Sequence, residues 1–378
     1  MLDADPGELG LDEAALGRLR QLALESVEVE GLPSCQLALA VRDRVALFEA
    51  FGEATTDSRY VVFSVTKALT AGAIWLLFGD GSLTPSTPVA DVVPEFAENG
   101  KGAVTVEHVM THTAGFPRAP MRPLEGGDRA ARLERLRSWR LDWEPGTRTE
   151  YHPSSADWVL AEVAERVAGA PLAEVIAGRI TGPLGLSELR LGVPAGEQDR
   201  VLDGHTIGEM SEQTRVALDA VGASATLAET GREQLMRFND PEVRGVGVPG
   251  AGAIGTAADV TRYFQALRRN DGAVWDRGVL ADATGVVRNA LIDPWTQVPA
   301  NRTLGLRIAG DDGNAVLRGF GKGVGPRAFG SSGVGGQVAW ADPDSGLSFC
   351  YLTNGLDEDP VRSFQRQAGL CAAAAACV

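Results

Sequence analysis

The sequence predicts an α/β fold of the α+β type, in which an antiparallel sheet is flanked by helices and joined to a mostly helical region. Strand-like alternation occurs near both ends of the chain, and apolar residues at helical spacing fill the part between them. The simplest architecture is a single domain over residues 1–378, with a sheet region at about 1–75 and 236–378 and a helical region at about 76–235. An active cleft is expected between the two parts.

The first segments predict one face and one edge of that sheet. Residues 11–28 carry apolar side chains at helical spacing and predict a surface helix. Residues 34–41 and 45–51 alternate around a short polar turn and predict a β-hairpin. Residues 60–63 form an extended lead into an apolar run at 68–77, which predicts a buried helix packed against the sheet.

The rest of the chain supplies the other elements. Further helices are predicted at residues 104–110, where Thr105 is a candidate N-cap, and at 129–140, 156–167, 172–180 and 257–269. The glycine-rich residues 250–256 lack a Walker lysine and predict a turn rather than a phosphate-binding loop. Strands are predicted to return at residues 303–308, 336–341 and 347–352, with a hairpin turn at 342–346.

Composition excludes several classes of function. A formal charge of −15 argues against nucleic acid or an anionic membrane surface as a partner. The N-terminus resembles no signal peptide and no apolar run is long enough to span a membrane, so we expect a cytoplasmic protein without stable membrane insertion. Four cysteines and four histidines show no metal-ligand spacing. We expect free thiols, no metal and no cofactor.

The stretch Ser64-Val65-Thr66-Lys67 is the first candidate for chemistry. On a helix, the hydroxyl and the amine lie one turn apart on the same face, with Ser64 at the helix N-terminus. Burial in the apolar run is expected to lower the pKa of Lys67, and a neutral lysine can serve as the base for a serine nucleophile. The alternative is an N-cap serine on a core helix, with a lysine that reaches solvent.

Two further motifs follow this stretch in order. Trp143-x-Pro145-Gly146-Thr147 precedes Tyr151, and later comes Phe329-Gly330-Ser331-Ser332-Gly333-Val334-Gly335-Gly336. Together the three motifs resemble the serine β-lactamase and penicillin-binding-protein superfamily, whose hallmark is S-x-x-K. More narrowly, the chain resembles class C β-lactamase-like esterases and lipases of the actinobacterial type, over residues from about 30 to 355. The resemblance implies a β-lactamase/transpeptidase-like fold.

The resemblance also implies roles for individual residues. Ser64 would be the acylated nucleophile, Lys67 its proton partner, and Tyr151 a second base that matches the tyrosine of a Y-x-N motif. A phenol is ordinarily protonated at neutral pH, and a neighbouring Lys67 would favour its anion. Backbone N–H groups of Ser64 and Val334 would hold the oxyanion. The alternative for Tyr151 is an aromatic residue at the edge of the core.

The third motif is expected on an edge strand that borders the cleft. Ser331, Ser332 and Gly333 are its candidate substrate-binding residues, and His152 is a further one because it can line the cleft. Its glycines suit a close approach of substrate to the backbone, and their alternative is a flexible turn.

Two positions depart from the family pattern. Pro153 stands where the asparagine of Y-x-N is expected, and Ser331 stands where the third motif usually begins with lysine, histidine or tryptophan. A lysine there would help to bind the carboxylate of a β-lactam or a peptide terminus. Its replacement by serine weakens the case for those substrates and leaves acyl transfer from an uncharged ester reasonable.

A Ser-His-Asp triad is the other arrangement to consider. No serine lies in a complete G-x-S-x-G elbow, which disfavours that reading. His112 is therefore expected to be a loop residue that bonds to its own backbone.

These observations predict a serine carboxylesterase or lipase that acts on uncharged esters through an acyl-Ser64 intermediate. The first alternative is an acyltransferase, amidase or β-lactam hydrolase of the same fold. The second is a catalytically weak homologue that binds a ligand without turnover. The expected partner is a small-molecule or lipid ester, and a homo-oligomer is possible. Residues 117–127 and 196–233 are expected to shape the pocket.

Overall fold

The computed structural model describes residues 3–220 and 231–378. Its centre is a six-stranded antiparallel sheet with the strand order β2-β1-β10-β9-β8-β7. The strands are β1 (Ser34–Val41), β2 (Arg44–Gly52), β7 (Arg307–Ile308), β8 (Phe329–Ser332), β9 (Val338–Ala341) and β10 (Leu347–Thr353). Because β1 pairs with β10, both ends of the chain build one sheet, and this prediction is confirmed.

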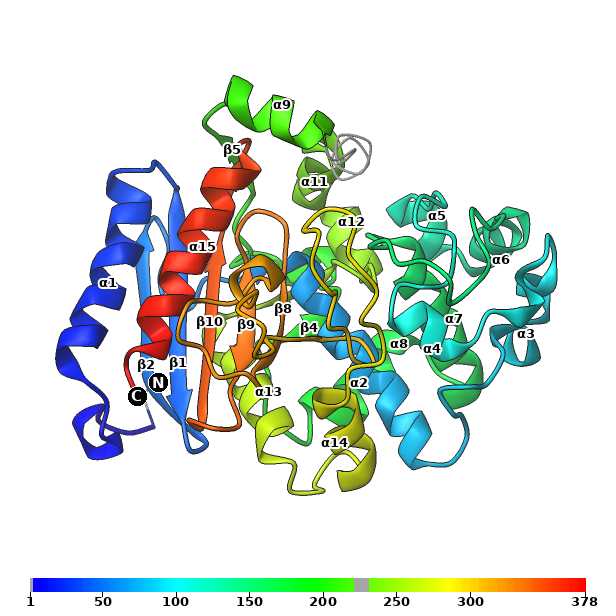
Figure 1. Cartoon of the computed structure of the whole chain (residues 1–378), viewed down its shortest axis with the longest axis horizontal. Helices are drawn as coiled ribbons and strands as arrows, with labels where there is room; N and C mark the ends of the chain where they lie inside the picture. The colour runs from blue at the N-terminus through cyan, green and yellow to red at the C-terminus, as the bar shows by residue number, and fades with distance from the viewer. Residues whose placement is uncertain (1–2, 221–230) are drawn as a thin grey trace.

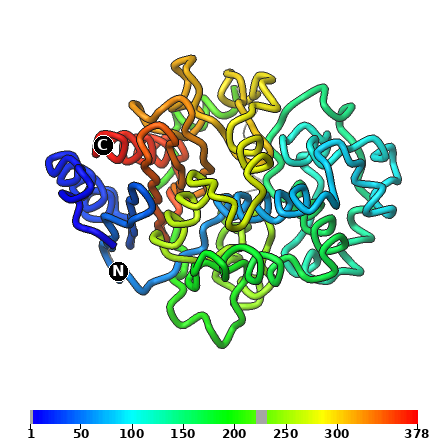
Figure 2. Tube along the Cα trace, turned by 90° about the horizontal axis from the view of Figure 1, so that it is seen from below, coloured from blue at the N-terminus to red at the C-terminus, as the bar shows by residue number. Residues whose placement is uncertain are grey.

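Helices cover both faces of the sheet. α1 (Glu13–Glu28) and α15 (Pro360–Ala375) lie side by side on one face, and α13 (Ala257–Arg269) packs on the other, against β1 and β10 (Figures 1 and 2). Side chains of β1 alternate between these layers: Leu37 and Leu39 pack with α1 and α15, whereas Ala38 belongs to the opposite cluster. β1 is therefore buried along its whole length.

The helical part surrounds α2 (Thr66–Gly79), which is buried from its first residue to Leu77 because it is apolar on every side. α2 contacts α7 (Ser155–Ala168), α8 (Leu172–Ile176) and α14 (Arg277–Gly285). The remaining helices lie mainly toward the right of Figure 1 and above the sheet. They are α3 (Val89–Val92), α4 (Val106–Met110), α5 (Pro123–Gly127), α6 (Arg129–Ser138), α9 (Glu212–Ala220), α11 (Arg232–Met236) and α12 (Pro241–Val246).

Two small sheets pair segments that are far apart in the sequence. β3 (Tyr60–Val61) pairs with β6 (Ala253–Gly255), which also pairs with β4 (Arg190–Leu191). β5 (His205–Ile207) runs parallel to β11 (Gly355–Asp357). The pairing of β3 with β6 brings the glycine-rich turn at 250–252 beside the start of α2.

Most predicted elements are present, and Thr105 caps α4 through a capping box as expected. The strand predicted at 303–308 was wrong in its first half, because Thr303 and Leu306 close a tight turn at Gly305, where φ is 105°. The helix predicted at 172–180 ends at Ile176 and continues as a π-helical turn.

The third motif was expected on an edge strand, and the structure corrects this. β8 lies between β9 and β7. However, β7 is only two residues long and pairs with Phe329 and Gly330 alone, so the β7 side of Ser331 and Ser332 has no strand partner.

Three other expectations concern membrane spans, region boundaries and the pocket. No helix in the described part of the chain is long and apolar enough to cross a membrane. The proposed boundaries of the sheet and helical regions stay a prediction. Of the segment expected to shape the pocket, residues 221–230 lie outside the described residues.

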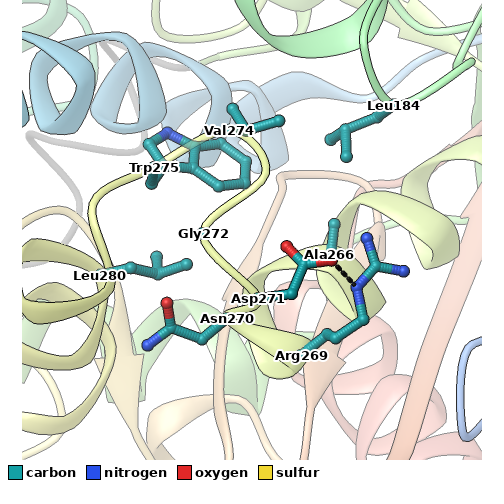
Figure 3. Close-up of a pocket in the computed structure, with 9 residues that line it drawn as sticks. All are labelled: Leu184, Ala266, Arg269, Asn270, Asp271, Gly272, Val274, Trp275 and Leu280. Carbon is teal, nitrogen blue, oxygen red and sulfur yellow. Dashed lines mark ion pairs between the residues drawn. The ribbon is translucent and has the colours of Figure 1, made fainter.

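A narrow hollow with no room for a water molecule lies between α13, the loop that follows it and α14 (Figure 3). It is lined in part by Trp275 and Leu280, and Arg269 pairs there with Asp271 at 2.7 Å. None of its lining residues was predicted to carry chemistry.

Candidate active site

Ser64 sits in a single 3₁₀ turn, Phe63–Val65, between β3 and α2. The preceding Phe63 has a φ of 44°, a left-handed conformation that non-glycine residues rarely adopt. Its ring packs edge-on against Phe238, with ring centres 5.4 Å apart. The backbone N–H of Val62 is held by the carbonyl of Ala253. This sharp, anchored turn places Ser64 just before α2, half-buried rather than in the core.

Tyr151 approaches Ser64 from the loop before α7. Its Oη donates a hydrogen bond to Ser64 Oγ at 2.8 Å. The ring centre of His112 lies 4.9 Å from that of Tyr151, and that of Trp295 lies 6.4 Å away. The structure thus brings together two of the predicted site residues that are far apart in the sequence.

Lys67 is the second residue of α2, three residues after Ser64, and its Nζ has three acceptors. It donates to the carbonyls of Pro153 at 2.8 Å and Gly250 at 3.1 Å, and lies 2.8 Å from Asp157 Oδ2. An ammonium group has three donors and no lone pair, so three acceptors fit the charged form of the side chain. Pro153, which replaces the expected asparagine, therefore meets Lys67 through its backbone carbonyl.

The charge state of Lys67 corrects the expectation of a neutral amine. Burial works against the ammonium, but the charges of Asp157 and Tyr151 favour it, and the net effect raises the pKa of Lys67 above its ordinary value. The lysine and aspartate side chains are only 7% and 4% exposed. Burial raises the pKa of the Asp157 carboxyl, and Lys67 opposes that rise. The prediction of a lowered lysine pKa was wrong because it left Asp157 out.

Asp157 gave no clear signal in the sequence. It lies in the first turn of α7, where an acidic residue is ordinarily explained by the helix dipole. Only the tertiary structure shows that the first turn of α7 packs against α2, so that Asp157 meets Lys67.

Gly250 completes the pocket of the ion pair. A Cβ atom at this position would lie 2.7 Å from both Lys67 Nζ and Asp157 Oδ2. Any side chain would therefore separate the backbone carbonyl of residue 250 from the lysine that it binds. The glycine-rich turn serves this close approach.

The third motif contacts the nucleophile through Ser331. Its Oγ donates to the backbone carbonyl of Ser64 at 3.0 Å. Ser332 lies on the opposite face of β8, since a Cβ at Gly319 would be 3.3 Å from its Oγ. The backbone N–H of Val334 makes no hydrogen bond with a described residue.

Close packing and positive φ angles require the glycines of this motif. A Cβ at Gly333 would lie 2.9 Å from the carbonyl oxygen of Val62. Gly335 and Gly336 have φ values of 88° and 100°, in the left-handed region that favours glycine. The turn is thus a defined one that lies against the segment leading to Ser64.

The two histidines beside Tyr151 are buried and neutral. His152 is 0% exposed, accepts from the N–H of Phe116 through Nε2 and donates to the carbonyl of Glu150 through Nδ1. Burial lowers its pKa to about 3. His112 accepts from the N–H of His152, and burial lowers its pKa well below the ordinary range. His152 was expected to line the cleft, and in the structure it lies beneath the surface instead.

A triad has no basis in these contacts. Both histidines use their ring nitrogens on backbone groups as far as described residues go, and Ser64 Oγ is bonded to Tyr151. The arrangement can transfer a proton between two oxygens, with a lysine ammonium held nearby. Sequence reasoning named Ser64, Lys67 and Tyr151, which the structure brings close together, and it did not name Asp157 or the buried Arg302.

Known proteins resemble this chain along most of its length. The model of a family described as Beta-lactamase matches residues 19–374. Esterase/beta-lactamase LipL of Mycobacterium tuberculosis is 28% identical over 328 residues, which cover 80% of this chain and 70% of LipL. Esterase EstB of Burkholderia gladioli is 29% identical over 310 residues, which cover 74% of this chain and 76% of EstB.

Solved structures agree with the fold. A penicillin-binding-protein homologue from Caulobacter crescentus superimposes with a TM-score of 0.76 at 28% identity, covering 96% of this chain and 98% of the other. A family VIII carboxylesterase gives a TM-score of 0.78 at 24% identity over 96% and 98% of the two chains. At that identity the second likeness speaks for the fold alone.

Proposed function

This chain belongs to the beta-lactamase family, and from that premise we propose that it is a serine hydrolase of the carboxylesterase or lipase type. Its fold is that of β-lactamases and penicillin-binding proteins. The observation that carries the proposal is the 2.8 Å hydrogen bond between Tyr151 Oη and Ser64 Oγ. Two relatives named as esterases support the choice of reaction.

The reaction begins at Ser64. Its Oγ bonds to the ester carbonyl carbon while its proton moves to the oxygen of Tyr151, which must be anionic to receive it. The N–H groups of Ser64 and Val334 hold the oxyanion. Collapse breaks the bond to the alkoxide, which takes the proton from Tyr151 and leaves as alcohol. Water then attacks the acyl-enzyme by the same route, and the carboxylic acid leaves.

Lys67 has an electrostatic role in this scheme. As an ammonium it has no lone pair for the serine proton, and its charge instead favours the tyrosine anion. Its Nζ lies 5.4 Å from the centre of the Tyr151 ring. His112 and His152 pack near Tyr151 and position it, which we propose in place of substrate binding for His152.

We propose uncharged carboxylic esters as substrates. Position 331 offers a hydroxyl, and that hydroxyl is already bonded to the carbonyl of Ser64. A substrate carboxylate would therefore find no ammonium at this point of the third motif. Ser332 and Gly333 remain substrate-binding candidates through their backbone.

Hydrolysis of β-lactams and ligand binding without turnover are the two alternatives to esterase activity. Because LipL is named for both esterase and β-lactamase, turnover of a chromogenic cephalosporin is the natural second assay. A homologue that binds without turnover would form no acyl-enzyme. We also propose a cytoplasmic location, which agrees with four cysteines that are free and buried.

The test uses a short-chain nitrophenyl ester with the parent and Ser64→Ala. We expect a burst of nitrophenol from the parent, a loss of at least about a thousandfold in kcat for the variant, and a mass adduct of a serine phosphonate at Ser64. Ser332→Ala is the matched control, since it removes a hydroxyl that points away from the site, and it should retain activity. Equal turnover by Ser64→Ala and the parent would refute the proposal.

A further inference from the structure

Arg302 is a second cation beside Tyr151, and it comes from the segment before β7. Its backbone bridges Asn289 and Arg307. Its guanidinium carbon lies 5.4 Å from the centre of the Tyr151 ring, the same separation as that of Lys67 Nζ. One phenol ring thus has two positively charged side chains within cation–π range.

The guanidinium of Arg302 is buried without a counterion. The residue is 5% exposed, and its Nη2 has no hydrogen-bond partner among the described residues. No carboxylate in the described ranges lies within ion-pair distance of it. Burial lowers the pKa of Arg302 to about 9, with Arg307 adding to the effect and Asp293 opposing it. The side chain is still charged at neutral pH.

Such a charge destabilises a fold, because its desolvation is not offset by a partner. Uncompensated buried charges concentrate at functional sites. Among the described residues, the aromatic ring within cation–π range of this guanidinium is that of Tyr151. An effect on Tyr151 would therefore explain why a buried, unpaired charge is kept at position 302.

The other positive group near Tyr151 supplies a weaker field. Lys67 is paired with Asp157 at 2.8 Å, so part of its effect on the phenol is offset by the carboxylate. The third motif contributes the uncharged Ser331. Arg302 is therefore the unneutralised charge that faces the phenol ring.

We propose that Arg302 is a positioning residue that stabilises the anionic oxygen of Tyr151, the form that accepts the proton of Ser64. This inference rests on the proposed function. The bond that forms is Tyr151 Oη–H, the bond that breaks is Ser64 Oγ–H, and the proton returns to the departing alkoxide. Arg302 keeps its own protons throughout.

Other titratable or charged groups lie around Tyr151 and Arg302 and are part of any pH dependence. They come from α2, α7, the loops at 112 and 150–152, the loop at 293 and β7: Lys67, Asp157, His112, Glu150, His152, Asp293 and Arg307. The two histidines stay neutral at working pH. Glu150 is partnered by Arg118 at 2.8 Å, and burial raises the pKa of Glu150, so it needs a control of its own.

The tyrosine content allows a measurement that does not depend on turnover. The chain has four tyrosines. Burial raises the pKa values of Tyr60, Tyr263 and Tyr351. Subtracting the ultraviolet titration of Tyr151→Phe from that of the parent therefore isolates the ionisation of one phenol.

The experiment measures this difference titration in three backgrounds: the parent, Arg302→Met and Arg302→Lys. In each background, the titration of the same protein with Tyr151→Phe added is subtracted. We expect Arg302→Met to move the midpoint upward by about one pH unit or more, and Arg302→Lys to move it less. The melting temperature of Arg302→Met should be unchanged or higher, because a buried unpaired charge is removed. An unchanged midpoint in Arg302→Met would overturn the proposal, whatever the esterase assay shows.

Kinetics add the functional arm. We expect Arg302→Met to lose about tenfold or more in kcat/KM at pH 7, with the deficit shrinking as pH rises. Glu150→Gln should keep the acidic limb of the profile where the parent has it. A loss that is uniform across pH, or equal in Arg302→Lys and Arg302→Met, would overturn a role through Tyr151. If the parent itself shows no Ser64-dependent turnover, the proposed function fails, and the spectroscopic arm still decides the role of Arg302.

Discussion

Two regions of the molecule bury a lysine, and they treat its charge in opposite ways. Lys101 is fully buried in the helical part, where its Nζ donates to the carbonyls of Glu98, Arg137 and Trp139. Burial lowers its pKa to about 8. Lys67 also binds two carbonyls, but its third acceptor is a carboxylate, and its pKa is raised.

The difference shows what a carboxylate adds in a dry pocket. Carbonyl dipoles satisfy the three N–H donors of Lys101, yet they do not fully offset the loss of water around its charge. A full negative charge at 2.8 Å from Lys67 does so. A lysine is therefore held charged at the candidate active site, while one that only braces a loop is left closer to neutrality.

The largest expected effect comes from Lys67→Met, which leaves Asp157 buried without a partner. We expect a loss of about 3–5 kcal/mol in the free energy of unfolding near neutral pH, measured by urea denaturation. Esterase activity should fall by about a hundredfold or more. The double variant Lys67→Met/Asp157→Leu should regain stability and stay inactive. If the double variant were as unstable as the single one, the ion pair would not be the reason for the loss.

The same variant has a pH signature. In Lys67→Met, burial raises the pKa of Asp157 without the opposing charge of Lys67. A carboxyl whose pKa is higher in the folded state stabilises that state at low pH, and the contribution is lost as pH rises through the folded pKa. The stability deficit relative to the parent should therefore shrink toward acid pH. A deficit that grows toward acid pH would contradict this account.

A smaller effect is expected from Gly250→Ala, which pushes a methyl group against the ion pair. The new Cβ would lie 2.7 Å from both charged atoms, so the turn must shift. We expect a loss of about 1–3 kcal/mol in stability and up to about a hundredfold in kcat/KM. Gly102→Ala, next to Lys101, is the matched control because nothing lies within 4 Å of its Cβ position. Equal effects of the two substitutions would count against a role for the close approach.

The smallest effect on activity is expected from Lys101→Met. The change removes the Nζ donor from three buried carbonyls, of which that of Trp139 has no other donor among the described residues, whereas Arg137 still accepts from Asn99 and Glu98 from the Lys101 N–H. It should cost about 1–3 kcal/mol in stability, with kcat/KM of the folded protein unchanged. Because the pKa of Lys101 is lowered to about 8 in the folded state, the parent gains stability as pH rises from that value toward the ordinary lysine pKa. That gain should be absent from the variant. A drop in kcat/KM would break the contrast between the two lysines.

Local patterns account for what could be predicted. The apolar run after Ser64 identified a buried helix, since a helix that is hydrophobic on every side has no face for solvent. The alternation at 34–51 identified the β1–β2 hairpin, and Thr105 identified the start of α4. At 303–308 the same kind of pattern misled, because Gly305 closes a turn that alternation alone does not reveal.

The sequence by itself determined which hydroxyl and amine share one turn of helix, because a spacing of three residues sets their relation without help from the rest of the chain. Only the tertiary structure decided how those groups are charged and what faces them. Asp157, Gly250 and Arg302 each approach from a different part of the chain, and the pKa of a buried side chain depends on such neighbours rather than on its own position in the sequence.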